Sequence, residues 1–487
     1  MYERPRNWDV TSDDSPPTRR AYLRAAGATA AAAALAGCAE RDPGTSSPTD
    51  SPPPGTTGTP GSPTAETTAG DPATGTTETQ TIESVDRADY ETVVNVAEEG
   101  ADTSGEEPVN PILDEHVGDD TLLYFPPGRY RLTDWRVVDY RNLGVVGTDA
   151  TFVPPDGHRS YWFQWGQLRD FTFAGVTIDN TAEGVAPTIR LSTSGGRNVV
   201  RDVEIEGHRR APRIAFEIDA VTRDTELLFE NVRLPDGSTD GHAIYVFPQS
   251  VGDLTFRDCH VEHWWEGLYA SYHSGPLRVL GGYYANNGIE QVRVGGGKTG
   301  AVVRGVTVRV DNPQQGENKP NMRGIWAEEG AQVRIEDCDI AITDLTGTYS
   351  SGGIVIGKQF GRATIENTRV RTDVNAPGIN VRNPVNSMEG QTIPSMDSLP
   401  DDWRVDCRNV RVEGSAASGT AVMTTRRDDC QFEGLCITHS EGSRNGIGVN
   451  TAEGCSVRNS TIAVSGEAIT TEDATVETEG VRTGGSC

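Results

Sequence analysis

A short unit recurs along most of the chain and limits its fold more than any other feature. In each copy but one an apolar residue is followed two positions later by Gly, Asn or Asp, and three positions after that by another apolar residue. In the copy at Val405, Cys407 replaces the turn residue. From Val145 to Val457 the repeat makes eleven steps in 312 residues, about 28 residues each. Such regularity indicates one supersecondary unit stacked on its neighbours. The copies begin at Val145, Phe173, Val200, Phe229, Phe256, Val279, Val303, Ile335, Ile365, Val405, Phe432 and Val457.

A second short apolar segment lies between successive units, and it is usually opened by Gly and Ile. It occurs at residues 189–191, 244–246, 268–270, 289–294, 325–327, 354–356, 379–381 and 447–449. Two or three short strands per repeat predict an all-β fold, a single-stranded right-handed parallel β-helix of about 12 coils, spaced by about 4.8 Å. The hairpin turns and the blade period of about 40 residues expected of sandwiches and propellers do not occur.

The residues before the repeat predict a cap. We expect a first strand at 93–96, a short capping helix at 108–117 and a turn at 124–130. The turn reads Tyr-Phe-Pro-Pro-Gly-Arg-Tyr and resembles the N-terminal cap of pectin-lyase-like β-helix proteins. The resemblance implies this architecture for about residues 90–475. Because that family contains polysaccharide lyases, glycoside hydrolases, epimerases and non-catalytic adhesins, it does not choose a function.

The N-terminus carries an export signature. Arg19 and Arg20 precede an Ala-rich stretch that ends in Leu-Ala-Gly before Cys38. This resembles a twin-arginine signal closed by a lipobox, which implies a lipid on Cys38 and a place on the extracellular face of the cell membrane. In residues 41–80, 30 of 40 positions are Ser, Thr, Pro or Gly, which predicts a disordered linker. We therefore expect a signal peptide at 1–38, a linker at 39–81 and the β-helix domain at 82–487.

The chain is strongly acidic. It has 71 acidic and 43 basic residues, a formal charge of −28, and only three lysines. This composition resembles that of proteins from extremely salt-loving archaea, and it argues against a nucleic-acid partner. No apolar run of 18 residues follows residue 40, so the sequence excludes a polytopic membrane protein and leaves the lipid as its one membrane contact.

One exposed row of the β-helix is predicted to carry the chemistry. It is expected to read Arg190, Glu217, Tyr245, Tyr269, Glu290, Trp326, Val355 and Asn380. Aromatic side chains stack on sugar rings, and planar guanidinium groups bind hydroxyls and carboxylates. The predicted substrate-binding residues are therefore Tyr245, Trp264, Trp265, Tyr269, Tyr272, Trp326 and Arg323. The alternative is that some of these aromatics only pack turns against the rod.

Two kinds of catalysis remain open from the sequence. Glycoside hydrolysis needs two carboxylates about 5–10 Å apart, and Glu266 and Glu290 begin strands of adjacent coils. Asp240 lies in Ser-Thr-Asp-Gly, which resembles an element of polygalacturonase-type hydrolases whose other elements do not occur here. Asp240 and Glu328 are therefore the reserve candidates for the two catalytic carboxylates. A lyase would instead use a base, and a cation or Ca²⁺ would neutralise the substrate carboxylate. The candidates for that role are Tyr245, Tyr269, His273, Arg293 and Lys358.

The predicted function is action on, or binding of, an extracellular polysaccharide, as a lyase or hydrolase of acidic glycans. The alternative is a non-catalytic glycan-binding or adhesin lipoprotein. No cysteine or histidine cluster has metal-ligand spacing, so the sequence predicts no metal site and no cofactor beyond the Ca²⁺ a lyase would need. Cys430 and Cys455 hold the same place in consecutive coils, either as a disulfide or as two buried thiols.

Overall fold

The computed structural model describes residues 86–314, 321–389, 393 and 395–487. The predicted signal residues Arg19, Arg20 and Cys38, and the whole predicted linker, lie outside these residues. Residues Thr81–Cys487 form one compact unit by their internal contacts. None of the helices in the described part is long and apolar enough to cross a membrane.

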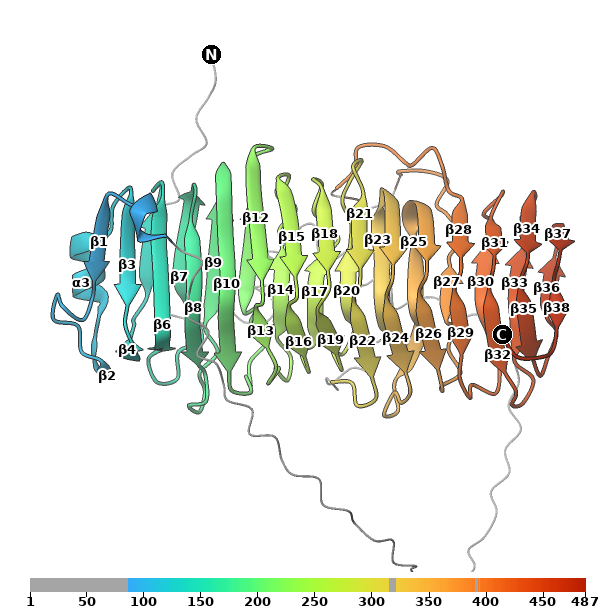
Figure 1. Cartoon of the computed structure of the whole chain (residues 1–487), viewed down its shortest axis with the longest axis horizontal. Coiled ribbons are helices and arrows are strands. Elements are labelled where there is room, and N and C mark those ends of the chain that lie inside the picture. Colours follow the sequence, from blue (N-terminus) through green and yellow to red (C-terminus); the bar gives the residue numbers. More distant parts are fainter. Residues whose placement is uncertain (1–85, 315–320, 390–392, 394) are drawn as a thin grey trace, which may run out of the picture. The chain divides into compact units, whose positions relative to one another are not determined.

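The fold is an all-β, right-handed parallel β-helix of about 13 turns, whose strands follow one another in sequence order along the axis (Figure 1). The predicted fold class is therefore confirmed. The sequence predicted about 12 coils because the first and last coils lack the clear repeat. The predicted capping helix is α3 (Asn110–His116), and a short 3-10 helix, η1 (Arg87–Asp89), precedes the first strand.

Three parallel sheets line the coils, and long strands bend from one sheet into the next. Sheet A contains β1 (Thr92–Asn95), β3 (Thr121–Phe125), the first parts of β6 (Leu143–Val153), β8 (Thr172–Asp179) and β10 (Gly196–Glu206), β12 (Thr225–Glu230), β15 (Asp253–Arg257), β18 (Leu277–Leu280), β21 (Ala301–Arg304), the last parts of β23 (Asn321–Glu336) and β25 (Tyr349–Glu366), β28 (Val405–Arg408), β31 (Gln431–Glu433), β34 (Cys455–Arg458) and β37 (Val476–Glu479).

Sheet B follows sheet A around each coil. It contains β2 (Ser104–Pro108), β4 (Gly128–Arg131), the last parts of β6, β8 and β10, β13 (Arg233–Leu234), β16 (His260–Glu262), β19 (Tyr283–Ala285), β22 (Thr307–Val310), β24 (Asp339–Ile342), β26 (Arg369–Thr372), β29 (Arg411–Glu413), β32 (Cys436–His439), β35 (Thr461–Val464) and β38 (Arg482–Thr483).

Sheet C closes the coil and contains the second strand series that the sequence predicted. Its members are β5 (Trp135–Val138), β7 (Tyr161–Leu168), β9 (Thr188–Thr193), β11 (Phe216–Ala220), β14 (His242–Val246), β17 (Glu266–Ala270), β20 (Glu290–Val294), the first parts of β23 and β25, β27 (Ile379–Val381), β30 (Thr420–Thr425), β33 (Asn445–Asn450) and β36 (Ile469–Glu472).

The repeated Gly, Asn or Asp lies in the turn from sheet A to sheet B. Asp202, Asn231 and Gly281 have φ values of 52°, 49° and 66°, a left-handed conformation that these residue types tolerate best. The copy at Val405 was read two residues early: Cys407 pairs with Ile365 inside the coil, and Asn409, with φ of 52°, makes the turn.

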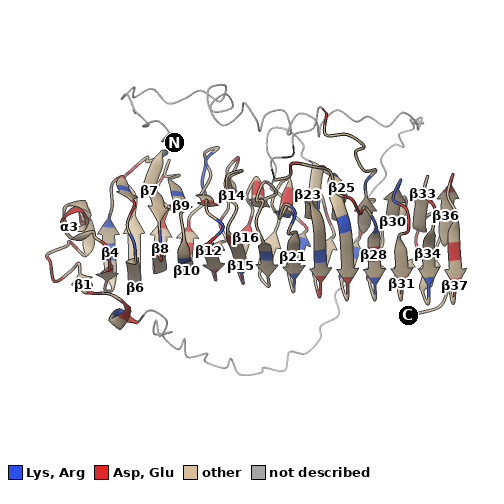
Figure 2. Cartoon of the chain, turned by 90° about the horizontal axis from the view of Figure 1, so that it is seen from above, with Lys and Arg blue, Asp and Glu red and all other residues tan. Residues whose placement is uncertain are grey.

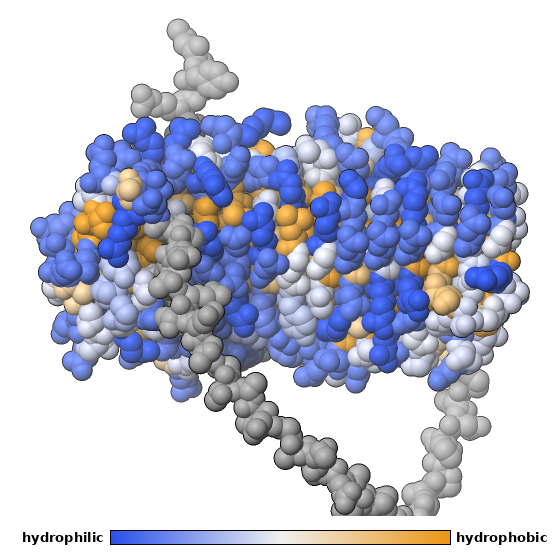
Figure 3. Space-filling model, viewed as in Figure 1, coloured by the Kyte–Doolittle hydropathy of each residue, from blue (hydrophilic) through white to orange (hydrophobic). Residues whose placement is uncertain are grey.

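The apolar residue that opens each unit points into the coil and forms a buried column. Val200 pairs with Phe229, Phe229 with Phe256, and Phe256 with Val279, and all four are at most 1% exposed. The outside is polar, with acidic and basic side chains interspersed along the rod (Figures 2 and 3).

The sequence left two arrangements open for Cys430 and Cys455, and in the structure they are buried thiols. The disulfide joins Cys436 and Cys487 instead, with Cα atoms 5.8 Å apart. Cys436 in β32 and the last residue of the chain meet because the final coil brings the C-terminus back to sheet B.

Candidate active site

The exterior of sheet C carries a row of stacked side chains, one from each coil. Backbone pairing aligns Tyr245 with Tyr269, Tyr269 with Arg293, and Arg293 with Trp326. The sequence placed Glu290 in this row, and that assignment is wrong: Arg293 holds the place. Glu290 lies three residues earlier, in a second row.

The second row begins strands β14, β17 and β20 and continues into β23. His242 pairs with Glu266, and Glu290 pairs with Arg323. The register of β17 with β20 places Glu266 level with Glu290, because Leu268 pairs with Val292 and Tyr269 with Arg293. Adjacent coils are about 4.8 Å apart, so the two glutamates lie at neighbouring positions along the axis.

Arg293 is the centre where the two rows meet. Its Nε and Nη2 donate hydrogen bonds to the Glu328 carboxylate at 2.5 and 2.6 Å, and its Nη1 lies 3.8 Å from Glu266 Oε1. Its guanidinium carbon lies 3.8 Å from the Tyr269 ring centroid and 4.1 Å from that of Trp326. Because Arg293 is only 6% exposed, this bidentate pair and the two rings hold it in one geometry.

The stack continues beyond Arg293 in both directions. The Arg323 guanidinium lies 3.9 Å from the centroid of the Trp326 ring on one side. On the other, the ring centroids of Tyr245 and Tyr269 are 4.8 Å apart, and those of Tyr269 and Tyr272 are 5.3 Å apart. Of the predicted substrate-binding residues, five therefore gather in this cluster: Tyr245, Tyr269, Tyr272, Trp326 and Arg323.

The pKa values of the two glutamates in the second row are shifted in opposite directions. Burial, and then the charge of Glu266, raise the pKa of Glu290 well above its usual range. Burial also acts to raise the pKa of Glu266, but His242, Arg293 and Arg323 outweigh it and lower that pKa. His242 Nδ1 is in direct contact with Glu266 Oε2, and the two form an ion pair when the ring is protonated. This arrangement favours the protonated form of Glu290 and the ionised form of Glu266.

Several buried polar atoms of the cluster have no hydrogen-bond partner. Apart from His242 Nδ1 and Glu266 Oε2, which contact each other, they are both carboxyl oxygens of Glu290, the Nε of Arg323 and the Nε1 of Trp326. Buried polar groups are paired in the great majority of native structures, so unpaired ones on three adjacent residues need an explanation. A polar ligand bound among these atoms would satisfy them.

Other predicted residues do not join the cluster. Trp264 is 1% exposed, belongs to the hydrophobic core and donates from Nε1 to the Leu234 carbonyl at 3.0 Å, so it packs inside the coils and is not part of the cluster. His273 is fully buried, with Nδ1 2.9 Å from Ser250 Oγ and Nε2 3.1 Å from the Pro276 carbonyl oxygen. Burial lowers the pKa of His273 to about 4, so it remains neutral and serves packing.

Two more predicted residues lie at the margin. Trp265 is half-buried next to Glu266 in the turn before β17, and Asp240 is half-buried two residues before β14. Neither side chain forms an ion pair or hydrogen bond with the cluster among the described residues. Conversely, the sequence did not single out His242 as a site residue, and it held Glu328 only in reserve. The signal for His242 was its place one coil before Glu266, which the strand register would have shown.

The described residues contain no group of three His, Cys, Asp or Glu side chains arranged to hold a metal ion. The arrangement offers an acid, a carboxylate, two guanidinium groups and four aromatic rings on one face. These define a parallel β-helix protein with a charged and aromatic cluster on sheet C.

The chain was compared with known proteins. No protein-family model matches it, and no curated protein matches its sequence. Similar solved structures include the A-module of the mannuronan C-5 epimerase AlgE6 of Azotobacter vinelandii, with 14% identity and a TM-score of 0.41, covering 81% of this chain and 100% of that one. They also include PfbA, a surface adhesin of Streptococcus pneumoniae, with 12% identity and a TM-score of 0.42, covering 80% of this chain and 92% of that one. At these values neither resemblance carries an argument about activity.

Proposed function

We propose that the chain hydrolyses glycosidic bonds in an acidic polysaccharide, with Glu290 as general acid and Glu266 as the second carboxylate. The observation that carries this proposal is the placement of two glutamates at neighbouring positions with different contacts: Glu266 lies against His242 and 3.8 Å from Arg293, whereas neither oxygen of Glu290 has a hydrogen-bond partner. These contacts shift the two pKa values in opposite directions. Environments that push the pKa values of two carboxyls apart assign one as acid and the other as base or nucleophile. The coil spacing of about 4.8 Å suits the separation of about 5–10 Å that glycosidases use.

In the proposed step the bond between the anomeric carbon and the glycosidic oxygen breaks. Glu290 gives its proton to the departing oxygen, and Glu266 either attacks the anomeric carbon or takes a proton from the water that does. One water molecule is consumed and both carboxyls return to their starting states. Arg293, held by Glu328 and two rings, fixes the position of Glu266 throughout.

The cluster suits lyase chemistry less well. A lyase base must be able to accept a proton, but burial raises the pKa of Tyr269 well above its usual range, so its hydroxyl stays protonated. Arg293 is held as a cation in an ion pair with Glu328. Both ring nitrogens of His273 contact residues outside the cluster, Ser250 and Pro276. Hydrolysis therefore has the better-placed groups.

An acidic substrate is favoured by Arg323. Burial, and then repulsion from Arg382, lower the pKa of Arg323 to about 10, so two guanidinium groups lie close together. Arg323 forms no ion pair with any described residue. A sugar carboxylate placed between Arg323 and Arg382 would offset their repulsion.

A second candidate function is glycan binding without catalysis. The observation that favours it is the burial of Glu290, which is 0% exposed and so has no direct path for substrate in this conformation. In that case the rows of rings and guanidinium groups would bind the polysaccharide, and the two glutamates would serve only the network around Arg293.

We also propose that the protein is exported by the twin-arginine route and held on the extracellular face by a lipid on Cys38. The paired Arg19 and Arg20 and the Leu-Ala-Gly-Cys sequence support this. Substituting Cys38→Ser should move the protein from the membrane fraction to the medium, and substituting both arginines by lysine should retain it in the cell. Unchanged fractionation of both variants would contradict the proposal.

The activity is tested by incubating the full chain in concentrated salt with polyuronates and with neutral polysaccharides. We expect new reducing ends from a polyuronate without the ultraviolet absorbance of an unsaturated product, and a rate of release at least about a hundredfold lower from the Glu290→Gln variant. Ultraviolet absorbance would mean a lyase instead. Polyuronate retention without any cleavage would favour the glycan-binding alternative.

A further inference from the structure

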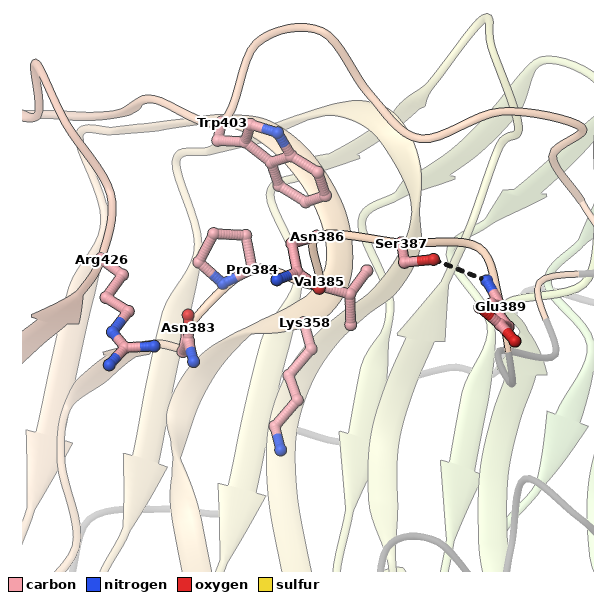
Figure 4. A pocket seen from close by; sticks show the side chains of 9 residues that line it. All are labelled: Lys358, Asn383, Pro384, Val385, Asn386, Ser387, Glu389, Trp403 and Arg426. Carbon is pink, nitrogen blue, oxygen red and sulfur yellow. Dashed lines mark hydrogen bonds between the residues drawn. The ribbon is translucent and has the colours of Figure 1, made fainter.

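A pocket opens on the same side of the coils, beyond the cluster. It has a volume of about 570 Å³, and the residues that line it come from β25, the segment after β27 and the turn after β30. Lys358, Asn383 and Arg426 project from its lower edge, Trp403 lies above it, and Ser387 and Glu389 close one end (Figure 4).

Strand register places three of these residues in one row across successive coils. Ile356 pairs with Val381 and Val381 with Thr424, so Lys358, Asn383 and Arg426 each follow a paired residue by two positions. The row also leads back to the cluster, because Gln359 pairs with Glu329, the residue next to Glu328. Arg426 is four coils from Arg293, about 19 Å along the axis at about 4.8 Å per coil.

The chemistry of the pocket suits an anion on a sugar ring. Lys358 and Arg426 bring two cationic groups to the pocket, where they lie with the carboxylate of Glu389 and the amide of Asn383. Arg426 is exposed and forms no ion pair with the described residues, and its φ of 51° places it at a tight turn. Lys358 is one of only three lysines in a chain that otherwise uses arginine for its positive charge.

Trp403, the aromatic residue that lines the pocket, is held in place by the buried Arg427. Arg427 is fully buried and donates from Nη1 to the Trp403 carbonyl at 3.0 Å, and its guanidinium carbon lies 5.2 Å from the Trp403 ring centroid. It also donates from Nε to the Arg382 carbonyl at 3.0 Å. Both ends of the segment 382–403 are thus fixed to the rod, so the Trp403 ring is positioned before any ligand arrives.

We propose that this pocket is a distal subsite that binds a carboxylate-bearing sugar unit of the same polysaccharide chain whose bond is cleaved at Glu266 and Glu290. The inference rests on the proposed function, because it takes the substrate to be an acidic glycan lying along the axis. The chain would run across the coils from Tyr245, past Arg293, to Arg426. The subsite would then make binding depend on substrate length.

The test compares oligouronides of increasing length by calorimetry, with the full chain and its variants. The pocket variant is Lys358→Met combined with Arg426→Asn, since asparagine tolerates a positive φ. The matched control is Lys298→Met, which also removes a lysine charge, but at an ion pair with Asp397 outside the pocket. The catalytic cluster is unchanged in both.

We expect the wild type to bind long oligouronides more tightly than short ones, and the pocket variant to lose this gain, roughly tenfold, because charge-assisted hydrogen bonds disappear. Affinity for short oligouronides should stay unchanged, and methyl-esterified long chains should show no gain. A pocket variant that keeps the gain, or a Lys298→Met control that loses it too, would overturn the subsite while leaving the proposed activity intact. A wild type that binds no oligouronide of any length would overturn both.

Discussion

Glu266 and Glu290 hold the same place on neighbouring coils, yet their pKa values move in opposite directions. The difference arises from what each carboxyl contacts. Glu266 has His242 against one oxygen and Arg293 3.8 Å from the other, whereas Glu290 has no hydrogen-bond partner on either oxygen. A stack of equivalent coils thus produces two non-equivalent carboxyls, because the residues on either side of them differ.

This asymmetry predicts the pH dependence of the proposed hydrolysis. Glu290 must be protonated, so activity should fall as the pH rises through its raised pKa. Glu266 must be ionised, so activity should fall only at acid pH, below its lowered pKa. We expect Glu290→Gln to reduce kcat by a factor of about 10² to 10⁴. The measurement is kcat/KM against pH for the wild type and for Glu290→Gln. The fall of activity at alkaline pH should be present in the wild type and absent from the residual activity of the variant.

The outcome is decided by comparison with Asp240→Asn, which changes a nearby carboxyl that forms no ion pair or hydrogen bond with the cluster among the described residues. If Asp240→Asn abolishes activity and Glu290→Gln leaves it intact, the assignment of the acid is wrong.

The Arg293–Glu328 pair predicts a large and non-additive effect on stability. Arg293→Met alone leaves Glu328 with an uncompensated charge in a site where its side chain is only 13% exposed, which should cost about 3–5 kcal/mol. Adding Glu328→Gln removes that charge, so the double variant should be more stable than the sum of the single effects predicts. Denaturant unfolding of the four proteins measures the coupling.

An exposed ion pair provides the control for that cycle. Arg458 Nη2 lies 3.8 Å from Glu477 Oε2, and both side chains are at least half exposed. A double-mutant cycle on this pair should therefore give a coupling energy of less than about 1 kcal/mol. Equal coupling at the two sites would contradict the role given to burial.

The fold was predictable because its repeat is local. The positive φ at Asp202 and Asn231 requires residue types that the sequence displays, and an apolar residue at a fixed spacing can only be the inward one. The end coils were missed because their strands, such as β37 and β38, are largely exposed and carry little apolar pattern. At Cys407 a small apolar residue in an inward position was taken for the turn itself.

The site was predictable only in part. Tyr269 and Trp326 were predicted in the row where the structure has them, but Glu290 was placed there instead of Arg293. A local pattern does not fix the register of one coil against the next, and the observed register puts Glu290 level with Glu266. Burial was also invisible: Trp264 and Trp265 are adjacent in sequence, yet the first is in the core and the second is half-buried.

Glu329 predicts a pH dependence of stability. Burial, and then Glu328, raise the pKa of Glu329 to about 8, while its Oε1 accepts the Ser395 N–H at 3.0 Å. An unfolded glutamate titrates near about 4.3, so between these values the folded protein binds more protons and its stability falls as pH rises. Glu329→Gln cannot ionise. It should therefore gain stability over the wild type above pH of about 8 and differ little at pH of about 4.

Thermal unfolding across this pH range checks the sign. The exposed Glu441→Gln variant should follow the wild-type curve throughout. A stability difference between wild type and Glu329→Gln that does not change with pH would show that Glu329 is ionised in the folded protein.

The disulfide predicts a dependence on reducing agent. Cys436 and Cys487 are 51 residues apart, and a link over that length stabilises by about 4 kcal/mol in the chain-entropy account. Cys487→Ser should therefore lower stability and increase hydrogen exchange in β36–β38. Since the other five described cysteines are buried thiols, reductant should destabilise the wild type but not Cys487→Ser. A further loss in the variant would reveal a second disulfide, such as one between Cys430 and Cys455.

The hydrogen bonds of the buried Arg427 predict that its removal will destabilise the protein and release both ends of the segment 382–403, which borders the pocket. Besides Arg382 and Trp403, its guanidinium donates to the carbonyls of Gly357, Phe360 and Gly361 at 2.8, 2.9 and 3.0 Å. Arg427→Met would leave these buried acceptors unpaired, at about 1–3 kcal/mol for each one that water does not reach. We expect a loss of at least about 3 kcal/mol and a change in Trp403 fluorescence. The neighbouring Arg426→Asn, at an exposed position, should change neither, and a Met variant as stable as the wild type would show that the segment is held by other contacts.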